Sequence, residues 1–126
     1  MLYAAARFSD LPGPGARLEA RRSRFESNLM EAAEPHLGTL AFNVQRLARV
    51  LGMSVRTLQL RMRKLKLPTP ASWLRALRLE RARMLLRIQA YDTVGEVAAA
   101  VGMSPSHFSR AFTAHTGLRP SALIRS

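Results

Sequence analysis

Apolar residues recur at helical spacing in two stretches of this chain, residues 44–62 and residues 94–112. Gly52 lies in the middle of the first stretch, where a residue that tolerates positive φ can form a tight turn. Ser54 follows it and is placed to cap a second helix. The first stretch therefore predicts two short helices joined by a turn, which is the spacing of a helix-turn-helix. Its expected inward positions are Leu47, Val50, Leu51, Leu58 and Met62.

The second stretch repeats the first one fifty positions later. Gly102 corresponds to Gly52 and Ser104 corresponds to Ser54. Both inward positions of the second helix are again apolar. A single pattern of this kind arises by chance in many helical proteins. Two copies in register, with matching caps and apolar positions, are a specific signal for an internal repeat.

The segments around the first repeat also read as helical. An apolar stripe that includes Phe25 and Leu29 predicts a helix from about Ala16 to the region of Pro35. Asn43 is the expected N-cap of the helix that follows. The run LPGPG at residues 11–15 should break any helix and has the composition of a linker.

Between the two repeats lies a stretch of twenty residues, 71–90, that contains neither Pro nor Gly. It predicts a long helix starting at Thr69 or Pro70, with a length of about 30 Å at ~1.5 Å per residue. Helices that read successive major-groove segments from one face of B-DNA lie about 34 Å apart. A rigid connector of this length could set that distance within one chain.

The second repeat has its own start and stop signals. Asp92 or Thr93 is the expected N-cap, and Glu96 stands where a capping-box partner would. The second helix of this repeat is expected to begin near Ser104 and to end at Gly117. Pro120 then starts a last short helix that returns Leu123 and Ile124 to the core.

The predicted fold class is therefore all-α, with two helix-turn-helix subdomains built as homeodomain-like three-helix units and joined by a long linker helix. We divide the chain into four parts. These are a linker or remnant of an upstream segment (1–22), the first subdomain (23–68), the linker helix (69–90) and the second subdomain (91–126).

The chain carries a net charge of +12, and this charge is unevenly placed. Residues 1–40 hold five Arg and five acidic residues, whereas residues 41–70 hold seven Lys or Arg and no acid. A basic surface concentrated on the first repeat favours a polyanionic partner, because counterion release then supplies affinity. The alternative is that the basic residues form a solvated surface that binds no partner.

Composition excludes several kinds of chemistry. The absence of Cys excludes disulfides and thiolate sites, and the three His residues lack metal-ligand spacing. No catalytic constellation, metal site or cofactor site is predicted, so we do not expect an enzyme. No run is long enough to span a membrane, and the N-terminus lacks the features of a signal peptide. We therefore expect a cytoplasmic, nucleoid-associated protein with no membrane partner.

Glu80 and His115 have more than one interpretation at this stage. Glu80 is the only acid on the long helix, and it could form a surface pair with Arg83 or orient an Arg between the two units. His115, near the end of a helix, is most simply a favourable contact with the helix dipole.

Three classes of function fit a basic helical repeat: duplex DNA binding, protein interaction, and binding to RNA or a membrane surface. The acid-balanced residues 1–40 are the best argument for a helical protein-interaction module. RNA modules usually expose aromatic residues for stacking, but here the aromatic residues fall on apolar stripes. The duplicated units favour sequence-specific binding to double-stranded DNA.

The residues that carry the repeat resemble the DNA-binding domain of the AraC/XylS family of bacterial transcription regulators. The resemblance covers residues 25–126 and rests on LGMS at 51–54, RTLQ at 56–59, RLERA at 78–82 and, most specifically, GMSPSHFSRAFTAHTGLRPSALIR at 102–125. It implies that the second helix of each unit enters the major groove. It also implies that Arg56, Gln59, Leu60, Arg63, Ser106, His107, Ser109 and Arg110 face DNA.

Three positions depart from the family pattern. Met103 replaces the usual Phe, which is a tolerable exchange in a core. Leu60 stands where the family often has Arg, which suggests apolar contact with a thymine methyl group. Leu67 stands where Gly commonly ends the first recognition helix, so we expect that helix to end differently.

The full set of predicted DNA-binding residues adds caps and flanking positions to those implied by the resemblance. It comprises Ser54, Arg56, Thr57, Gln59, Leu60, Arg61, Arg63, Lys64, Ser104, Ser106, His107, Ser109, Arg110 and Thr113.

The expected partners are double-stranded DNA and RNA polymerase. The usual sensory domain of the family does not fit into residues 1–40. The chain is therefore either a fragment of a longer regulator, with an upstream sensory or receiver domain, or a short regulator without a sensor. The first case includes the output domain of a two-component or ligand-sensing regulator.

Overall fold

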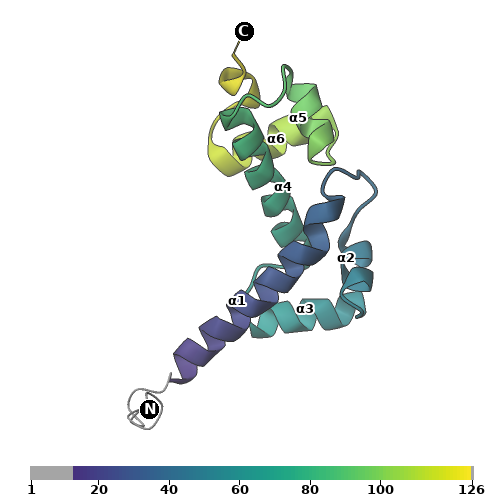
Figure 1. The fold of residues 1–126 in the computed structure, drawn as a ribbon, viewed down its shortest axis with the longest axis vertical. Helices are drawn as coiled ribbons and strands as arrows, with labels where there is room; N and C mark the ends of the chain where they lie inside the picture. Colours follow the sequence, from purple (N-terminus) through teal and green to yellow (C-terminus); the bar gives the residue numbers. More distant parts are fainter. Residues whose placement is uncertain (1–12, 126) are drawn as a thin grey trace, which may run out of the picture.

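The computed structural model describes residues 13–125, and this part of the chain is helical without any strand. It forms an elongated molecule with α4 along its long axis, as Figure 1 shows. The helices in chain order are α1 (Pro14–Ala33), the 3₁₀ helix η3 (Glu34–His36), α2 (Val44–Val50), α3 (Val55–Lys64), α4 (Pro70–Arg87), α5 (Val94–Ala100), α6 (Pro105–Thr116) and the 3₁₀ helix η4 (Pro120–Leu123). The predicted all-α fold is confirmed.

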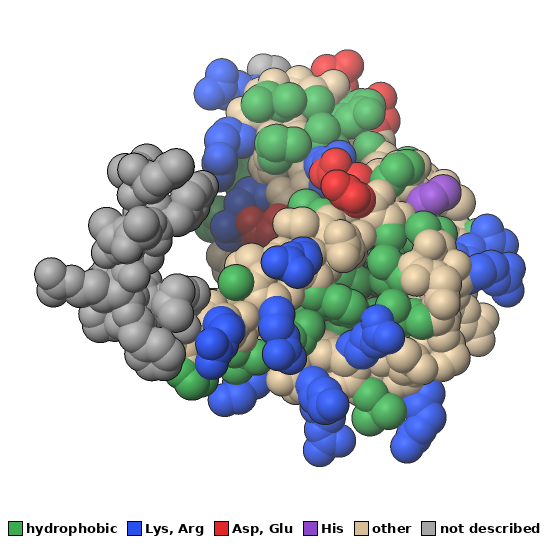
Figure 2. Space-filling view, turned by 60° about the horizontal axis from the view of Figure 1, so that its bottom comes forward, with side chains coloured by type: hydrophobic (Ala, Val, Ile, Leu, Met, Phe, Trp, Pro, Cys, Tyr) green, Lys and Arg blue, Asp and Glu red, His purple; other side chains and the backbone are tan. Residues whose placement is uncertain are grey.

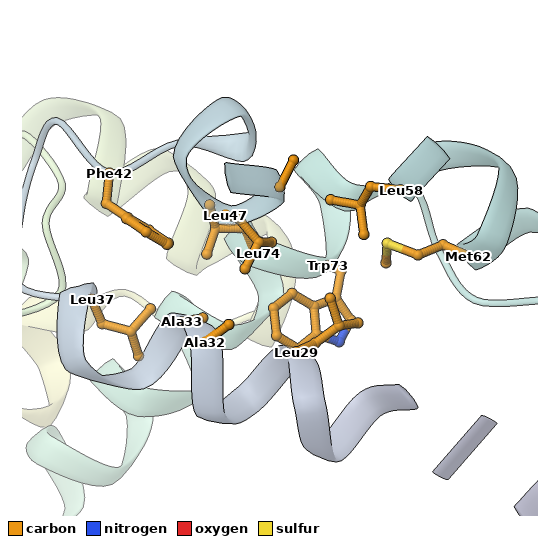
Figure 3. Close-up of a cluster of buried hydrophobic side chains, with 11 residues drawn as sticks. Leu29, Ala32, Ala33, Leu37, Phe42, Leu47, Leu58, Met62, Trp73 and Leu74 are labelled. Carbon is orange, nitrogen blue, oxygen red and sulfur yellow. The ribbon is translucent and has the colours of Figure 1, made fainter. Parts of the chain in front are cut away.

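The first unit packs α1, α2 and α3 around the N-terminal half of α4. Trp73 of α4 lies between Leu29 of α1 and Met62 of α3, as Figure 3 shows. Burying one such large side chain stabilises the fold by about 1.5–3 kcal/mol. The cluster joins all four helices, because each of them supplies buried residues to it. Its buried members are Leu29, Ala32, Ala33, Leu37, Phe42, Leu47, Ala48, Leu58, Met62, Trp73 and Leu74.

The second unit packs α5, α6 and η4 around the C-terminal half of α4. Phe108 and Phe112 of α6 form its centre, with ring centroids 5.4 Å apart. The other buried members of this core are Leu79, Ala82, Leu86, Val97, Ala98, Val101 and Met103. Because α4 supplies residues to both cores, it is the third helix of the second unit as well as the connector.

Most helix starts follow the predicted capping residues. The side chains of Asn43, Ser54 and Thr69 each accept a hydrogen bond from the backbone N–H three residues later, as N-caps do. Thr93 and Glu96 form the predicted capping box, with both reciprocal hydrogen bonds present. Local sequence signals thus place these helix starts to the residue.

Ser104 is an exception to the predicted capping. It has the extended backbone of an N-cap, like Ser54, but its side chain makes no capping hydrogen bond. Repeating the backbone conformation does not fix which staggered rotamer a serine hydroxyl adopts. The prediction that Ser104 caps α6 in the way Ser54 caps α3 is therefore wrong.

Val50 is a second correction. The sequence pattern predicts that it faces inward, but its side chain is 52% exposed. The buried stripe of α2 runs through Leu47, Ala48 and the partly buried Leu51. At ~100° per residue, Val50 lies about a quarter turn away from the centre of that stripe.

The end of α3 explains the departure at Leu67. Lys66 adopts positive φ (59°), and the N–H of Leu67 donates to the carbonyl of Met62 at 2.9 Å. This is the hydrogen bond of a Schellman motif, in which glycine is the usual left-handed residue. The prediction that α3 does not end on a glycine at position 67 is therefore confirmed, since the left-handed residue is Lys66, whereas α6 ends at Gly117 with φ 78°.

The helix before the first repeat starts and ends about two residues earlier than expected, and the expectation that LPGPG breaks any helix is wrong for Pro14 and Gly15, because proline fits the first turn of a helix. The helix predicted from about Ala16 begins at Pro14 and runs to Ala33. Of the predicted linker, residues 1–12 lie outside the described residues. The division of the chain into four parts stays a prediction.

Candidate nucleic-acid interface

One face of α3 is exposed while the opposite face anchors the helix. Leu58 and Met62 are fully buried, and Arg56, Leu60 and Arg63 lie on the exposed side at spacings of four and three residues. Leu60 is 48% exposed although it is apolar. The face therefore combines two guanidinium groups with an apolar contact point between them.

The remaining predicted residues of the first unit flank this face. Gln59, Arg61 and Lys64 are exposed. The Ser54 hydroxyl is engaged within the protein, because it accepts from the Thr57 N–H at 3.1 Å and donates to the Thr57 Oγ1 at 3.0 Å. Ser54 and Thr57 thus hold the start of α3 in place.

The exposed face of α6 repeats this arrangement with different chemistry. Ser106, Arg110 and Thr113 take the positions that Arg56, Leu60 and Arg63 hold on α3, while Phe108 and Phe112 are buried. His107 and Ser104 are also exposed, and Ser109 is partly buried. The Thr113 hydroxyl donates to the Ser109 carbonyl at 2.8 Å.

The basic residues of α3 are not neutralised by acidic neighbours. Within residues 13–125, the ion pairs involve Arg81, Arg83 and His115. Figure 2 shows Lys and Arg side chains gathered over the end of the molecule that α1 and α3 form. The guanidinium groups of α3 are therefore available to an external anion such as a phosphate.

The two exposed faces belong to helices that pack on different halves of α4, α3 on the N-terminal half and α6 on the C-terminal half. In Figure 1, α3 and α6 both cross the long axis and run in the same sense, away from the side on which α2 and α5 lie. α4 is unbroken over 18 residues, about 27 Å at ~1.5 Å per residue. The prediction of a long continuous helix between the two repeats is thus confirmed, although α4 ends at Arg87 and not near residue 90.

Arg75 is a candidate that the sequence analysis missed. It is exposed on the N-terminal half of α4 and lines two surface hollows. One hollow is shared with His107 and Arg110 of α6, and the other with Asn43, at the start of α2. Arg75 therefore sits between the two exposed faces. Its position in the acid-poor connector was the only sequence signal that could have identified it.

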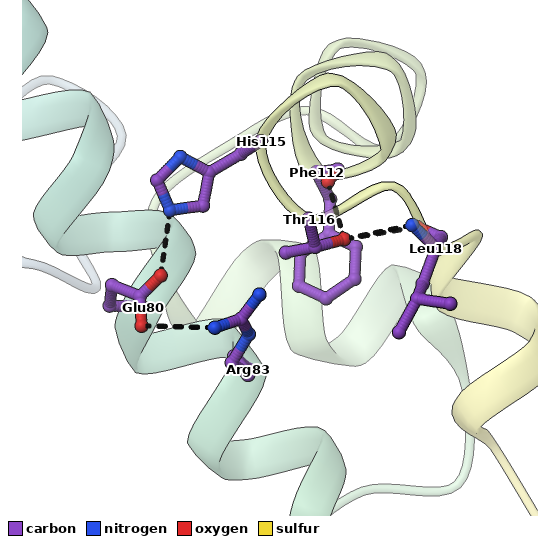
Figure 4. A network of polar contacts seen from close by, with 6 residues as sticks. All are labelled: Glu80, Arg83, Phe112, His115, Thr116 and Leu118. Atoms are coloured by element: carbon purple, nitrogen blue, oxygen red, sulfur yellow. Dashed lines mark hydrogen bonds and ion pairs between the residues drawn. The ribbon is translucent and has the colours of Figure 1, made fainter.

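Glu80 connects α4 to α6 and not to a bridging Arg. Its Oε2 lies 2.6 Å from Nε2 of His115, and its Oε1 lies 3.7 Å from Nη1 of Arg83, as Figure 4 shows. The surface pair with Arg83 is confirmed. The alternative, in which Glu80 orients an Arg between the units, is wrong because its second oxygen is occupied by His115.

Neither a metal-binding cluster nor a membrane-spanning helix occurs in the described part of the chain. Residues 13–125 contain no group of three or more His, Cys, Asp or Glu arranged to hold a metal ion. No helix in the same range combines the length and apolar character needed to cross a membrane.

Comparison with known proteins identifies the family. A family profile for a helix-turn-helix domain of the AraC type matches residues 47–126. The DNA-binding domain of the global transcriptional factor AdpA, solved in complex with a target DNA, is 34% identical, with a TM-score of 0.68 over 76% of this chain and 86% of that one. The chain belongs to the AraC/XylS family. As a member of this family, it is a sequence-specific DNA-binding domain that serves transcription regulation.

Further comparisons agree with the fold of this AraC/XylS-family domain. A DNA-binding transcriptional dual regulator from Escherichia coli K-12 has the same fold, with 23% identity and a TM-score of 0.66 over 75% of this chain and 84% of that one. A profile of bacterial regulatory proteins of the Fis family matches residues 22–65. The comparison with curated proteins found no match.

Proposed function

We propose that α3 and α6 enter adjacent major-groove segments of one DNA duplex and that their exposed faces read the bases there. The observation that carries this proposal is the placement of two equivalent exposed faces, similarly oriented, on helices that pack against the two halves of the continuous helix α4. A centre-to-centre spacing of one helical turn, about 34 Å, is what two such helices need on one face of B-DNA.

The proposed roles differ between the two faces. On α3, Arg56 and Arg63 suit guanine edges or phosphates, Gln59 suits adenine, and Leu60 suits a thymine methyl group. On α6, the serine and threonine hydroxyls and the His107 imidazole offer polar contacts from shorter side chains than arginine. Arg110 supplies the single charge of that helix. The first unit therefore contributes most of the charge-dependent affinity, and both units contribute to sequence selection.

Arg75 adds a contact between the two segments. The DNA backbone passes between adjacent major-groove segments on the face that both helices share. An exposed guanidinium on α4, beside His107 and Arg110, is placed to meet a phosphate there. Such a contact sets register but does not read sequence.

Binding-site selection from random duplexes tests this function. The proposal expects a motif with two conserved blocks whose centres lie about 10 base pairs apart, and protection of both blocks in a footprint. A motif with one block of about five base pairs, or no enriched motif, would contradict it.

Three finer assignments follow from the family and remain proposals. RNA polymerase is the expected protein partner, the cytoplasm with its nucleoid is the expected location, and an upstream sensory or receiver domain is the expected source of regulation. Co-purification of the polymerase with the DNA-bound chain tests the first of these.

A further inference from the structure

The turn of the second unit packs directly against the backbone of the first unit. Gly102 is buried, and a Cβ atom added to it would lie 2.5 Å from the Leu37 carbonyl oxygen and 3.0 Å from that of Thr39. A Cβ on Gly38 would lie 3.3 Å from the Ala100 carbonyl oxygen. Two backbone segments from different units therefore meet with no side chain between them.

The matching glycine of the first unit makes no such contact. Gly52 and Gly102 have the same φ of 72° and form the same turn. A Cβ on Gly52 would meet no atom within 4 Å. The left-handed conformation explains glycine at both positions, but the close approach between units is a property of Gly102 alone.

Arg78 reaches the same place from α4. Its Nη2 donates to the Thr39 carbonyl at 3.1 Å and to the Phe42 carbonyl at 2.9 Å. Arg78 lies between Leu77, which packs on the first core, and Leu79, which belongs to the second. The Arg78 side chain thus connects α4, at the point between the two cores, to the loop of the first unit against which Gly102 packs.

The environment of Arg78 is costly for a charged group. Burial lowers the pKa of its guanidinium from the ordinary value. Its Nε is buried and has no hydrogen-bond partner among the described residues. Buried donors without partners destabilise a fold, and buried charges are weak sources of stability. A role in orientation accounts better for an arginine here.

We propose that the inter-unit contact, formed by Leu37, Gly38, Thr39, Arg78 and Gly102, fixes α6 relative to α3 and so sets the DNA spacing that the chain accepts. The inference rests on the proposed function. Two linked binding units gain avidity only if their geometry allows both to engage, and a preformed arrangement lowers the ordering cost of binding. A loosened inter-unit contact should therefore weaken binding at the best spacing and tolerate other spacings.

Gly102→Ala tests this inference, with Gly52→Ala as the matched control. Both variants place Ala at φ 72°, but only Gly102→Ala forces the two units apart. The probe is a set of fluorescent duplexes that carry the selected two-block site with zero, one or two base pairs inserted between the blocks. Each inserted base pair rotates the second block by about 35°.

The expected results separate the two variants. The wild-type chain and Gly52→Ala should lose at least about tenfold in affinity on a one-base-pair insertion, as expected when one of two linked units cannot engage. Gly102→Ala should bind the uninserted site more weakly and lose less than about threefold on insertion. A Gly102→Ala profile that parallels the wild-type profile overturns the inference.

Arg78→Met decides the question if Gly102→Ala does not fold by circular dichroism. This variant keeps the glycine turn and much of the side-chain volume but removes both hydrogen bonds to the loop. It should broaden the accepted spacing, whereas Arg87→Met, at the exposed end of α4, should not. An unchanged Arg78→Met profile overturns the inference. A wild-type chain that shows no spacing preference would overturn the proposed function itself.

Discussion

The imidazole of His115 lies 2.6 Å from the carboxylate of Glu80, which ties the last turn of α6 to the middle of α4. Both side chains are partly exposed, at 31% and 51%. Solvent therefore screens this pair, and exposed pairs contribute about 0–1 kcal/mol.

Glu80→Gln should accordingly lower the free energy of unfolding by less than about 1 kcal/mol. Urea titration followed by circular dichroism measures this change, and Glu31→Gln on the exposed side of α1 is the control. A loss of more than about 2 kcal/mol would show that the pair is far stronger than its exposure implies.

The unequal caps of the two repeats give a second prediction. Ser54→Ala should cost about 1 kcal/mol of unfolding free energy, because it removes a side-chain hydrogen bond to the backbone of α3. Ser104→Ala should cost less than half of that, since its side chain makes no capping bond. Equal losses in parallel urea titrations would argue that Ser104 caps α6 in solution.

Arg75→Gln should weaken DNA binding without changing sequence preference. If Arg75 meets a phosphate, its removal lowers affinity on all sequences to a similar degree and reduces the salt slope by about 0.9. Fluorescence anisotropy at several salt concentrations measures both quantities, with Arg87→Gln at the far end of α4 as control. A changed motif in binding-site selection would instead assign Arg75 to base contact.

The charge difference between the two units predicts different salt dependences. Removing Arg61 and Arg63 together should flatten the plot of log affinity against log salt by about 1.8 units of slope, at ~0.9 for each phosphate that is no longer neutralised. The matched double variant Arg110→Gln with Arg119→Gln removes the same charge from the second unit. Its slope should change by less, because Arg119 follows α6 and lies only at the edge of the proposed reading face, in a hollow that it lines together with Arg110 and Thr113. Equal changes in slope would contradict the unequal division of charge-dependent affinity.

Local sequence signals predicted much of this fold. Asn43, Ser54 and Thr93 mark helix starts because a short polar side chain can satisfy a free N–H at that point. Gly52 and Gly102 mark the turns because few other residues tolerate positive φ. These signals act within a few residues and can be read without tertiary structure.

The features that the sequence did not predict depend on contacts between distant segments. Arg78 looked like any other arginine of the basic helix, and only the path of residues 39–42 makes its guanidinium a bridge. Gly102 looked equivalent to Gly52, although only Gly102 has a neighbouring unit packed against it. Glu80 was ambiguous for the same reason, since its partner His115 is 35 residues away.

The sequence also predicted the exposed faces of α3 and α6 better than their surroundings. The period of 3.6 residues separates Leu58 and Met62 from Arg56 and Arg63 without further information. It does not say which part of α4 lies beside each face. For that reason Arg75 emerged only from the arrangement of the two units around α4.

Gln59 offers the sharpest test of base reading in the first unit. It is exposed on α3 beside Leu60 and Arg63, and a glutamine amide can bond an adenine edge with two hydrogen bonds. Gln59→Ala should cost about 1–3 kcal/mol on the selected site and relax the preference at one base pair. Competition titrations against duplexes substituted at each position measure this loss, and Gln45→Ala, on the exposed side of α2, controls for the removal of an amide. A loss of equal size on every sequence would assign Gln59 to the phosphate backbone, because a phosphate contact carries no base information.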